Sequence, residues 1–190
     1  MHTLVLASNW AKSSKPLSRR SIVLSLAATA PAVLMWKSAH AQGDVWREFR
    51  RVDLGFRIEM PGEPKFETKE DEYKDIWIRS IDAEIDYEQT TFGVSWTEWK
   101  DVQSIEKVSA AFRAGMQLAG MPVTHEMSLV MNGFPARELI RQSDTLNYIH
   151  REVIMGKQTI TASALGDDSI HRSPTVRRFF DSFTLLRSAR

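Results

Sequence analysis

The stretch IWIRSIDAEIDYEQTTFGVSWTEW, residues 76–99, decides the fold. Apolar residues recur at every second position in both of its halves, and those of each half share one face of an expected strand: Trp77, Ile81, Ala83, Ile85, Phe92, Val94 and Trp96. A period of two on both sides of Glu88-Gln89 predicts two strands, Ile76–Tyr87 and Thr90–Trp99, that pair as a hairpin.

The pattern downstream of this hairpin changes to the helical period. Apolar residues spaced by three and four form one stripe along Ser104–Ala119: Ile105, Val108, Phe112, Met116 and Ala119. Ser104 is a suitable N-cap, and Gly120 followed by Pro122 is typical of a helix end. The sequence therefore predicts a helix with one buried side.

Shorter segments complete the expected sheet. Strands are predicted at Phe56–Met60, Thr124–Met131, Ala136–Gln142, Tyr148–Met155 and Thr159–Ala164. The turn Asn132-Gly133 is a strong hairpin signal. A second helix is expected to begin near Ser173-Pro174. We therefore predict an α+β domain, in which two helices cover a mostly antiparallel sheet on one face or both.

Four stretches carry a resemblance to a known fold: residues 56–64 (FRIEMPGEP), 132–138 (NGFPARE), 151–156 (REVIMG) and 177–183 (RRFFDSF). Together they resemble the recurring pattern of small exported bacterial domains with the PsbP/Mog1-like fold. That resemblance implies an α/β/α sandwich and a role as an accessory or binding module. It supplies no catalytic motif that matches this chain residue by residue.

Residues 18–42, SRRSIVLSLAATAPAVLMWKSAHAQ, have the order of an export signal: basic, apolar, then small. Arg19 and Arg20 resemble the twin-arginine signal, and the general secretory route is the alternative. Ala39 and Ala41 form an A-x-A ending of the kind that signal peptidase cuts. We expect residues 1–41 to be removed in the periplasm, leaving a single domain of residues 42–190.

Two other outcomes for this segment remain open. The apolar run Ile22–Trp36 is shorter than the roughly twenty residues that span a bilayer, but an uncleaved signal would tether the domain to the inner membrane. The other alternative is a cytosolic protein in which the same run forms a buried first helix.

Charge and composition exclude several classes of function. Residues 1–41 hold five Lys and Arg and no acidic residue, so residues 42–190 carry 20 − 24 = −4. This acidic balance argues against nucleic-acid binding, which depends on clustered cations. The chain has no cysteine, which excludes disulfides and thiolate chemistry. Motifs of serine hydrolases, zinc proteases and nucleotide-binding proteins are also missing.

Candidate site residues lie mainly on the hairpin. Asp82, Glu84, Asp86 and Glu88 alternate along its first strand and turn, so their carboxylates share one face. Oxygen-rich clusters bind cations such as Ca²⁺, although this face could equally be the wet side of the strand. Trp99 is out of phase with Trp96 and is expected to be exposed, where it would extend a surface for a protein partner or a small ligand.

A metal site assembled across strands is the alternative function. It would use His125 or His150 together with Glu138 or Glu152, since imidazole and carboxylate are ligands of divalent metals. His171 is the third histidine of residues 42–190, and none of the three has the spacing of a known metal motif. We therefore predict an exported accessory or binding domain with no catalytic constellation and no required cofactor.

Overall fold

The computed structural model describes residues 46–70, 77–142 and 146–187. Its main sheet has seven antiparallel strands in the order β3-β4-β5-β9-β8-β7-β6. Their bounds are Lys65–Glu70 (β3), Trp77–Tyr87 (β4), Thr90–Trp99 (β5), His125–Met131 (β6), Phe134–Arg141 (β7), Asn147–Met155 (β8) and Gln158–Gly166 (β9). The sheet is thus two meanders, β3-β4-β5 and β6-β7-β8-β9, joined where β5 pairs with β9.

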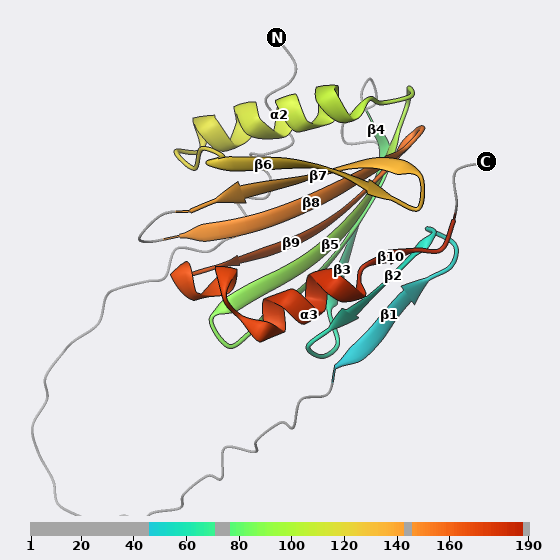
Figure 1. The fold of residues 1–190 in the computed structure, drawn as a ribbon. Coiled ribbons are helices and arrows are strands. Elements are labelled where there is room, and N and C mark those ends of the chain that lie inside the picture. The colour runs from blue at the N-terminus through green and yellow to red at the C-terminus, as the bar shows by residue number, and fades with distance from the viewer. Residues whose placement is uncertain (1–45, 71–76, 143–145, 188–190) are drawn as a thin grey trace, which may run out of the picture.

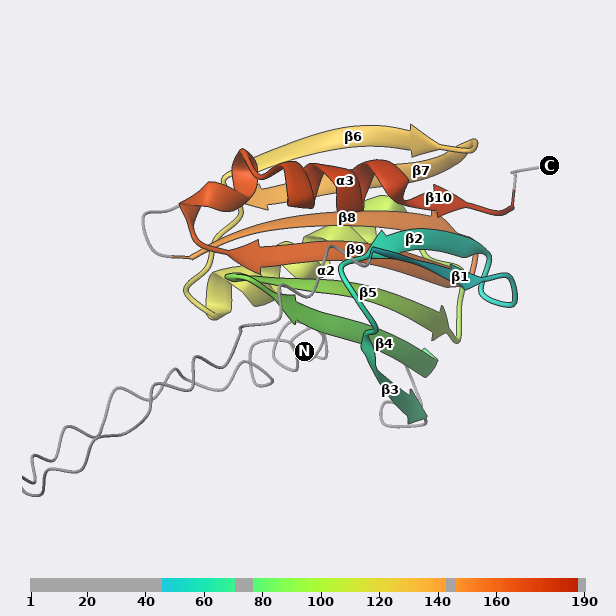
Figure 2. The same ribbon diagram turned by 90° about the horizontal axis from the view of Figure 1, so that it is seen from below.

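A smaller sheet and the helices complete the fold. The small sheet has the order β1-β2-β10, with β1 at Arg47–Arg51, β2 at Phe56–Met60 and β10 at Thr184–Leu185. The helices are α2 at Ile105–Leu118 and α3 at Pro174–Ser182, and a short 3-10 helix, η1, spans Asp168–His171. Figures 1 and 2 show α2 and α3 on opposite faces of the main sheet. The predicted α+β class, a mostly antiparallel sheet with two helices, is confirmed.

Local signals explain where both helices begin. The Ser104 hydroxyl accepts a hydrogen bond from the Lys107 backbone N–H at 3.3 Å, which caps α2. Ser173 accepts in the same way from the Val176 N–H at 3.3 Å, and Pro174 occupies the first turn of α3. In the described parts of the chain, neither helix has the length and apolar character needed to cross a membrane.

The hydrophobic core lies between the main sheet, α3 and the small sheet. Phe179 of α3 is fully buried and its ring centroid lies 5.0 Å from that of Phe92 on β5. Apolar side chains of β2, β5 and β9 fill the space around this pair: Phe56, Ile58, Met60, Val94, Trp96, Ile160, Ala162 and Ala164. The predicted apolar face of the hairpin is therefore the core face; the Trp77 side chain lies outside the described part of the structure.

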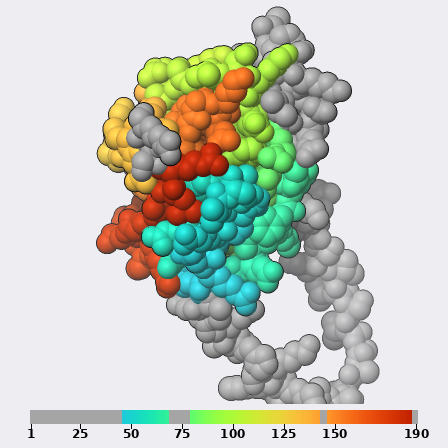
Figure 3. Space-filling view, turned by 90° about the vertical axis from the view of Figure 1, so that its right-hand side faces the viewer, coloured from blue at the N-terminus to red at the C-terminus, as the bar shows by residue number. Residues whose placement is uncertain are grey.

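Strand β1 and the C-terminal residues close the core from one side. The Phe49 ring meets the Phe56 ring edge-on at a centroid distance of 5.8 Å. The Arg178 guanidinium of α3 lies 4.4 Å from the centre of the Trp46 ring, a cation–π contact. In Figure 3 the blue residues of β1 and β2 pack directly against the red residues near the C-terminus. Strands β1, β3 and β10 were not predicted as strands. Strands β1 and β10 gain their order from pairing with β2, and β3 gains its order from pairing with β4.

Candidate functional site

The strand register gives the two faces of the main sheet different chemistry along their central rows. One row of side chains on the α2 side crosses five strands: Arg137, Glu152, Thr161, Ser95 and Asp82. The neighbouring row on the α3 side consists of Ala136, Val153, Ile160, Trp96 and Ile81. Because successive residues of a strand point to opposite faces, the apolar core and this polar surface are built from alternate residues of the same strands.

Helix α2 contacts the part of the polar face that is made by β6, β7 and β8. Its Ser109 hydroxyl donates a hydrogen bond to Glu152 Oε1 on β8. Its Phe112 ring stacks on the His150 imidazole with centroids 3.9 Å apart. The Arg113 guanidinium reaches Glu126 on β6 at 2.6 Å. Together with the ion pair between Glu106 and Arg137 on β7 at 3.8 Å, these contacts place α2 on β6, β7 and β8.

The polar groups beneath α2 form a buried chain of contacts. Glu152 is 1% exposed, and its Oε2 atom lies 3.4 Å from His150 Nε2. Its other oxygen accepts the bond from Ser109, which is fully buried. A serine nucleophile needs its hydroxyl on an imidazole or another base that a substrate can approach. Here the carboxylate stands between the hydroxyl and the imidazole, so the arrangement joins helix to sheet and is not a catalytic triad.

Sequence reasoning anticipated part of this cluster. It named His150 and Glu152, which the structure brings together. It did not name Ser109, which follows the predicted stripe residue Val108 and faces the same side of the helix. Glu138, offered as an alternative partner, instead lies at 2.6 Å from Arg151 Nη2. The position of Ser109 beside the apolar stripe was the sequence signal that could have indicated its burial.

Tyr148 lies two residues before His150 on β8 and therefore on the same face of the sheet. Its side chain is 1% exposed, and its ring meets the Phe112 ring edge-on at 5.9 Å. The phenol oxygen has no hydrogen-bond partner among the described residues. Burial raises the pKa of this phenol, because the charged form would lose its hydration.

The rest of the polar face we call the open half-face; it consists of Asp82, Glu84, Asp86, Thr91, Ser95, Thr161 and Ser163 on β4, β5 and β9. Ser95 Oγ donates to Asp82 Oδ1 at 2.5 Å, and Thr91 Oγ1 donates to Asp86 Oδ1 at 2.6 Å. Asp82 and Glu84 are half-buried, and Asp86 is exposed. The open half-face therefore combines a floor of hydroxyl groups with a row of carboxylates.

Glu84 lies at the centre of that row. Its pKa is raised, first because partial burial removes water from the carboxylate and then because Asp86 and Asp82 carry like charge. Gly93 lies opposite Glu84 on β5 and has no side chain to project from the open half-face. A Cβ atom at this position would lie 3.1 Å from Ser163 Oγ. A positive group placed against this row would relieve the repulsion among its carboxylates.

The remaining two residues of the predicted hairpin surface lie elsewhere. Glu88 is exposed in the turn, where its φ is 54°, and so stands beyond the end of the open half-face. The prediction that Trp99 is exposed is wrong. Its side chain is 5% exposed, and its indole Nε1 donates to Thr159 Oγ1 at 2.7 Å. Thr159 lies on β9, and the long-range pairing of β5 with β9 was not part of the sequence argument.

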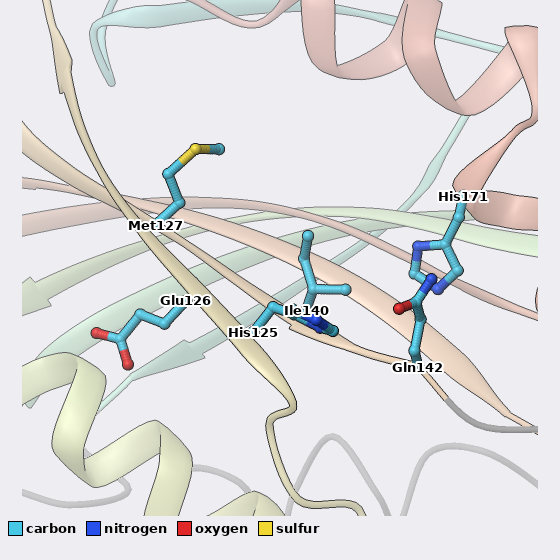
Figure 4. Close-up of a pocket in the computed structure, with 6 residues that line it drawn as sticks. All are labelled: His125, Glu126, Met127, Ile140, Gln142 and His171. Atoms are coloured by element: carbon cyan, nitrogen blue, oxygen red, sulfur yellow. The ribbon is translucent and has the colours of Figure 1, made fainter.

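A shallow hollow of about 290 Å³ lies near one end of the sheet, lined by His125, Glu126, Met127, Ile140, Gln142 and His171. Figure 4 shows His171 beside Gln142, with Glu126 and Met127 pointing in opposite directions from β6. Burial lowers the pKa of His171. His171 Nε2 lies 3.3 Å from Asn147 Oδ1, and His125 Nδ1 lies 3.0 Å from Thr124 Oγ1. Both imidazoles thus already have protein partners.

The two histidines predicted as metal ligands lie on opposite faces of the sheet. His125 pairs with Ile140 and His150 pairs with Leu139, so the two imidazoles belong to opposite faces. Among the described residues, no three His, Asp or Glu side chains come together in a way that could hold a metal ion. Arg19, Arg20, Ala39 and Ala41 of the expected export signal lie outside the described residues.

Comparisons with known proteins add little to this geometry. No family model matches the chain, and no curated protein matches it. Among solved structures, the chain is similar to a Pseudomonas aeruginosa protein of unknown function, at 10% sequence identity and a TM-score of 0.40. The alignment covers 76% of this chain and 99% of that one.

Proposed function

We propose that this chain is an exported accessory domain that binds a protein partner through the open half-face. The observation that carries the proposal is the division of the polar face. Helix α2 contacts the half on β6, β7 and β8, whereas the open half-face keeps a row of carboxylates beyond that helix. Carboxylates held this close favour a partner that brings Lys or Arg side chains.

The PsbP/Mog1-like resemblance belongs to the same proposal. Domains of that fold act as accessory or binding modules, and the α/β/α layering of the resemblance agrees with helices on both faces of the sheet. This support is by analogy, because a fold hosts many functions. Removal of residues 1–41 in the periplasm is also proposed. Intact mass spectrometry of the protein from the exported fraction tests it, since the expected species spans residues 42–190.

Affinity purification with matched charge variants tests the binding proposal. The variant Asp82→Asn/Glu84→Gln/Asp86→Asn removes three charges from the open half-face. The control Glu48→Gln/Asp53→Asn/Glu63→Gln removes three charges from surface positions around β1 and β2. We expect a partner from the exported fraction to bind the wild type and the control, to be lost from the first variant, and to elute as salt is raised. Equal retention by both variants would reject the open half-face as the binding surface.

A divalent cation on the same carboxylates is the second ligand class, because Asp82, Glu84 and Asp86 carry oxygen atoms of the kind that Ca²⁺ prefers. In the structure these three carboxylates do not come together as a metal-binding group, so a cation would have to draw them closer. A Ca²⁺ titration followed by thermal melting separates the two ideas, because a cation bound to the folded state raises the melting temperature. A rise that the Asp82→Asn/Glu84→Gln/Asp86→Asn variant abolishes would favour the cation. An unchanged melting temperature would leave the protein partner.

A further inference from the structure

Strand β6 is an edge strand of the main sheet as far as the described residues extend. It pairs with β7 on one side, and among the described residues no strand pairs with its other side. Val130 is 75% exposed and Met127 is 50% exposed. Figures 2 and 3 show β6 and the yellow β6–β7 residues at the margin of the molecule. The free backbone groups of such an edge are a template for another strand.

The edge strands β3 and β1 carry protection that β6 does not, and the remaining edge strand, β10, has only two residues. The edge strand β3 has the sequence KFETKE, and the edge strand β1 has the sequence REFRR. Charged side chains of this density discourage edge-to-edge pairing. Strand β6, HEMSLVM, has a single carboxylate, Glu126. That carboxylate is already paired with Arg113 at 2.6 Å and Arg137 at 2.8 Å, so it does not guard the edge.

The turn of the β6–β7 hairpin fixes which backbone groups face outward. Asn132 and Gly133 have φ values of 51° and 84°, as in a type I′ turn of two residues. Met131 and Phe134, which flank that turn, then exchange both of their hydrogen bonds. Alternation along the ladder leaves the N–H and C=O groups of Glu126, Ser128 and Val130 facing away from β7. Pro135 stands opposite Val130, where no N–H is needed for this ladder.

We propose that two copies of this chain pair β6 with β6, antiparallel, about a two-fold axis at Ser128. In that register Ser128 lies opposite its own copy, and Glu126 lies opposite Val130. All three outward-facing residues thus meet outward-facing residues, and each pair exchanges two backbone hydrogen bonds. The seven residues of β6 overlap completely, and the two main sheets become one continuous sheet.

The side chains match in the same register. On the α3 side of the sheet, Met127 lies opposite Leu129 of the second copy, and His125 lies opposite Met131. Leu129 and Met131 already pack against the hydrophobic core of their own chain, so the apolar contacts run from one core to the other. On the α2 side, no like charges stand directly opposite each other, because Glu126 faces Val130. The strand is therefore self-complementary in backbone and in side chains.

The helices leave room for this pairing. Helix α2 lies against β7, where Glu106 pairs with Arg137 at 3.8 Å, so the two α2 helices would be separated by three strand spacings, roughly 14 Å. Packed helices lie about 8–10 Å apart, so the two copies of α2 do not clash. Helix α3 packs over β5 and β8, further from the edge.

Charge variants of the purified protein test the register by light scattering after gel filtration. The proposal expects a dimer for the wild type. Ser128→Lys places two lysines opposite each other and should raise the dimer Kd about tenfold or more. The control Val130→Lys adds the same charge to the same strand but places it opposite Glu126, so the dimer should persist. Mixing Ser128→Lys with Ser128→Glu should restore a dimer that contains one copy of each.

A cysteine variant gives an independent geometric test, since the chain has no cysteine of its own. Opposite residues of a hydrogen-bonded antiparallel pair have Cα atoms about 5.5 Å apart, within the range of a disulfide. Ser128→Cys should form a covalent dimer on mild oxidation, whereas Thr68→Cys on β3 should not. A monomeric wild type, a dimer unaffected by Ser128→Lys, or equal cross-linking of both cysteine variants would overturn the proposal. Far-ultraviolet circular dichroism checks that each variant is folded.

Discussion

The two faces of the main sheet come from alternate residues of the same strands, yet they do different things. The α3-side row of Ala136, Val153, Ile160, Trp96 and Ile81 is apolar, and the α2-side row of Arg137, Glu152, Thr161, Ser95 and Asp82 is polar. The first face joins the core that α3 and the small sheet close. The comparison teaches that alternate residues of the same strands can build an apolar core on one face and a row of polar side chains on the other.

The largest effect is expected on the α3 side. Phe179→Ala removes a fully buried ring from between Phe92 and Phe180, and it should lower the free energy of unfolding by about 3–5 kcal/mol. Chemical denaturation measures this loss. The control Val102→Ala, at a position that is 69% exposed, should change it by no more than about 0.5 kcal/mol. Similar losses in the two variants would mean that the hydrophobic core does not lie on the α3 side of the main sheet.

A smaller effect is expected in the buried polar cluster under α2. Glu152→Ala leaves the Ser109 hydroxyl and the His150 imidazole without their partner, and should destabilise by about 1–3 kcal/mol. The double variant Ser109→Ala/Glu152→Leu replaces both polar partners by apolar groups, so part of that loss should be recovered. Denaturation curves for both variants decide the matter. If the double variant is less stable than Glu152→Ala, the polar contacts of the cluster stabilise the protein more than apolar side chains at the same positions do.

The Trp99 contact should contribute less. Trp99→Phe removes the indole donor from Thr159 and should lower the free energy of unfolding by about 1 kcal/mol. Thr159→Val removes the acceptor of the same bond. A double-mutant cycle should give a coupling energy of similar size, because the two side chains share one interaction. Additive effects would show that the bond contributes nothing measurable.

The smallest effect concerns Glu84 on the open half-face. Its folded-state pKa is raised, so the folded protein keeps a proton that the unfolded chain loses as pH rises above about 4.5. The free energy of unfolding therefore falls in the pH window between about 4.5 and the folded-state pKa of Glu84, and it stays lower above that window. Glu84→Gln should raise stability at neutral pH and leave it unchanged below the window. Thermal melts at both pH values test this, and an equal effect at both would contradict it.

The sequence predicts the local elements of this fold better than their partners. The hairpin, both capped helices and the Asn132-Gly133 turn follow from residue period, capping and turn chemistry within a few positions. Trp99 was misplaced because its burial depends on β9, sixty residues away along the chain. Ser109 was missed because only the assembled fold sets its hydroxyl against Glu152. Strands β1 and β10 carry weak signals of their own and gain order from β2.

The single junction between the two meanders has a consequence for how the chain folds. Within β3-β4-β5 and within β6-β7-β8-β9, every strand pairs with a neighbour in sequence. Within the main sheet, only the pairing of β5 with β9 must close a long loop, because Thr91 meets Leu165 across the whole of α2, β6, β7 and β8. Loop closure of this kind slows folding, so we expect each meander to form early and the β5–β9 junction to set the rate at which the main sheet forms.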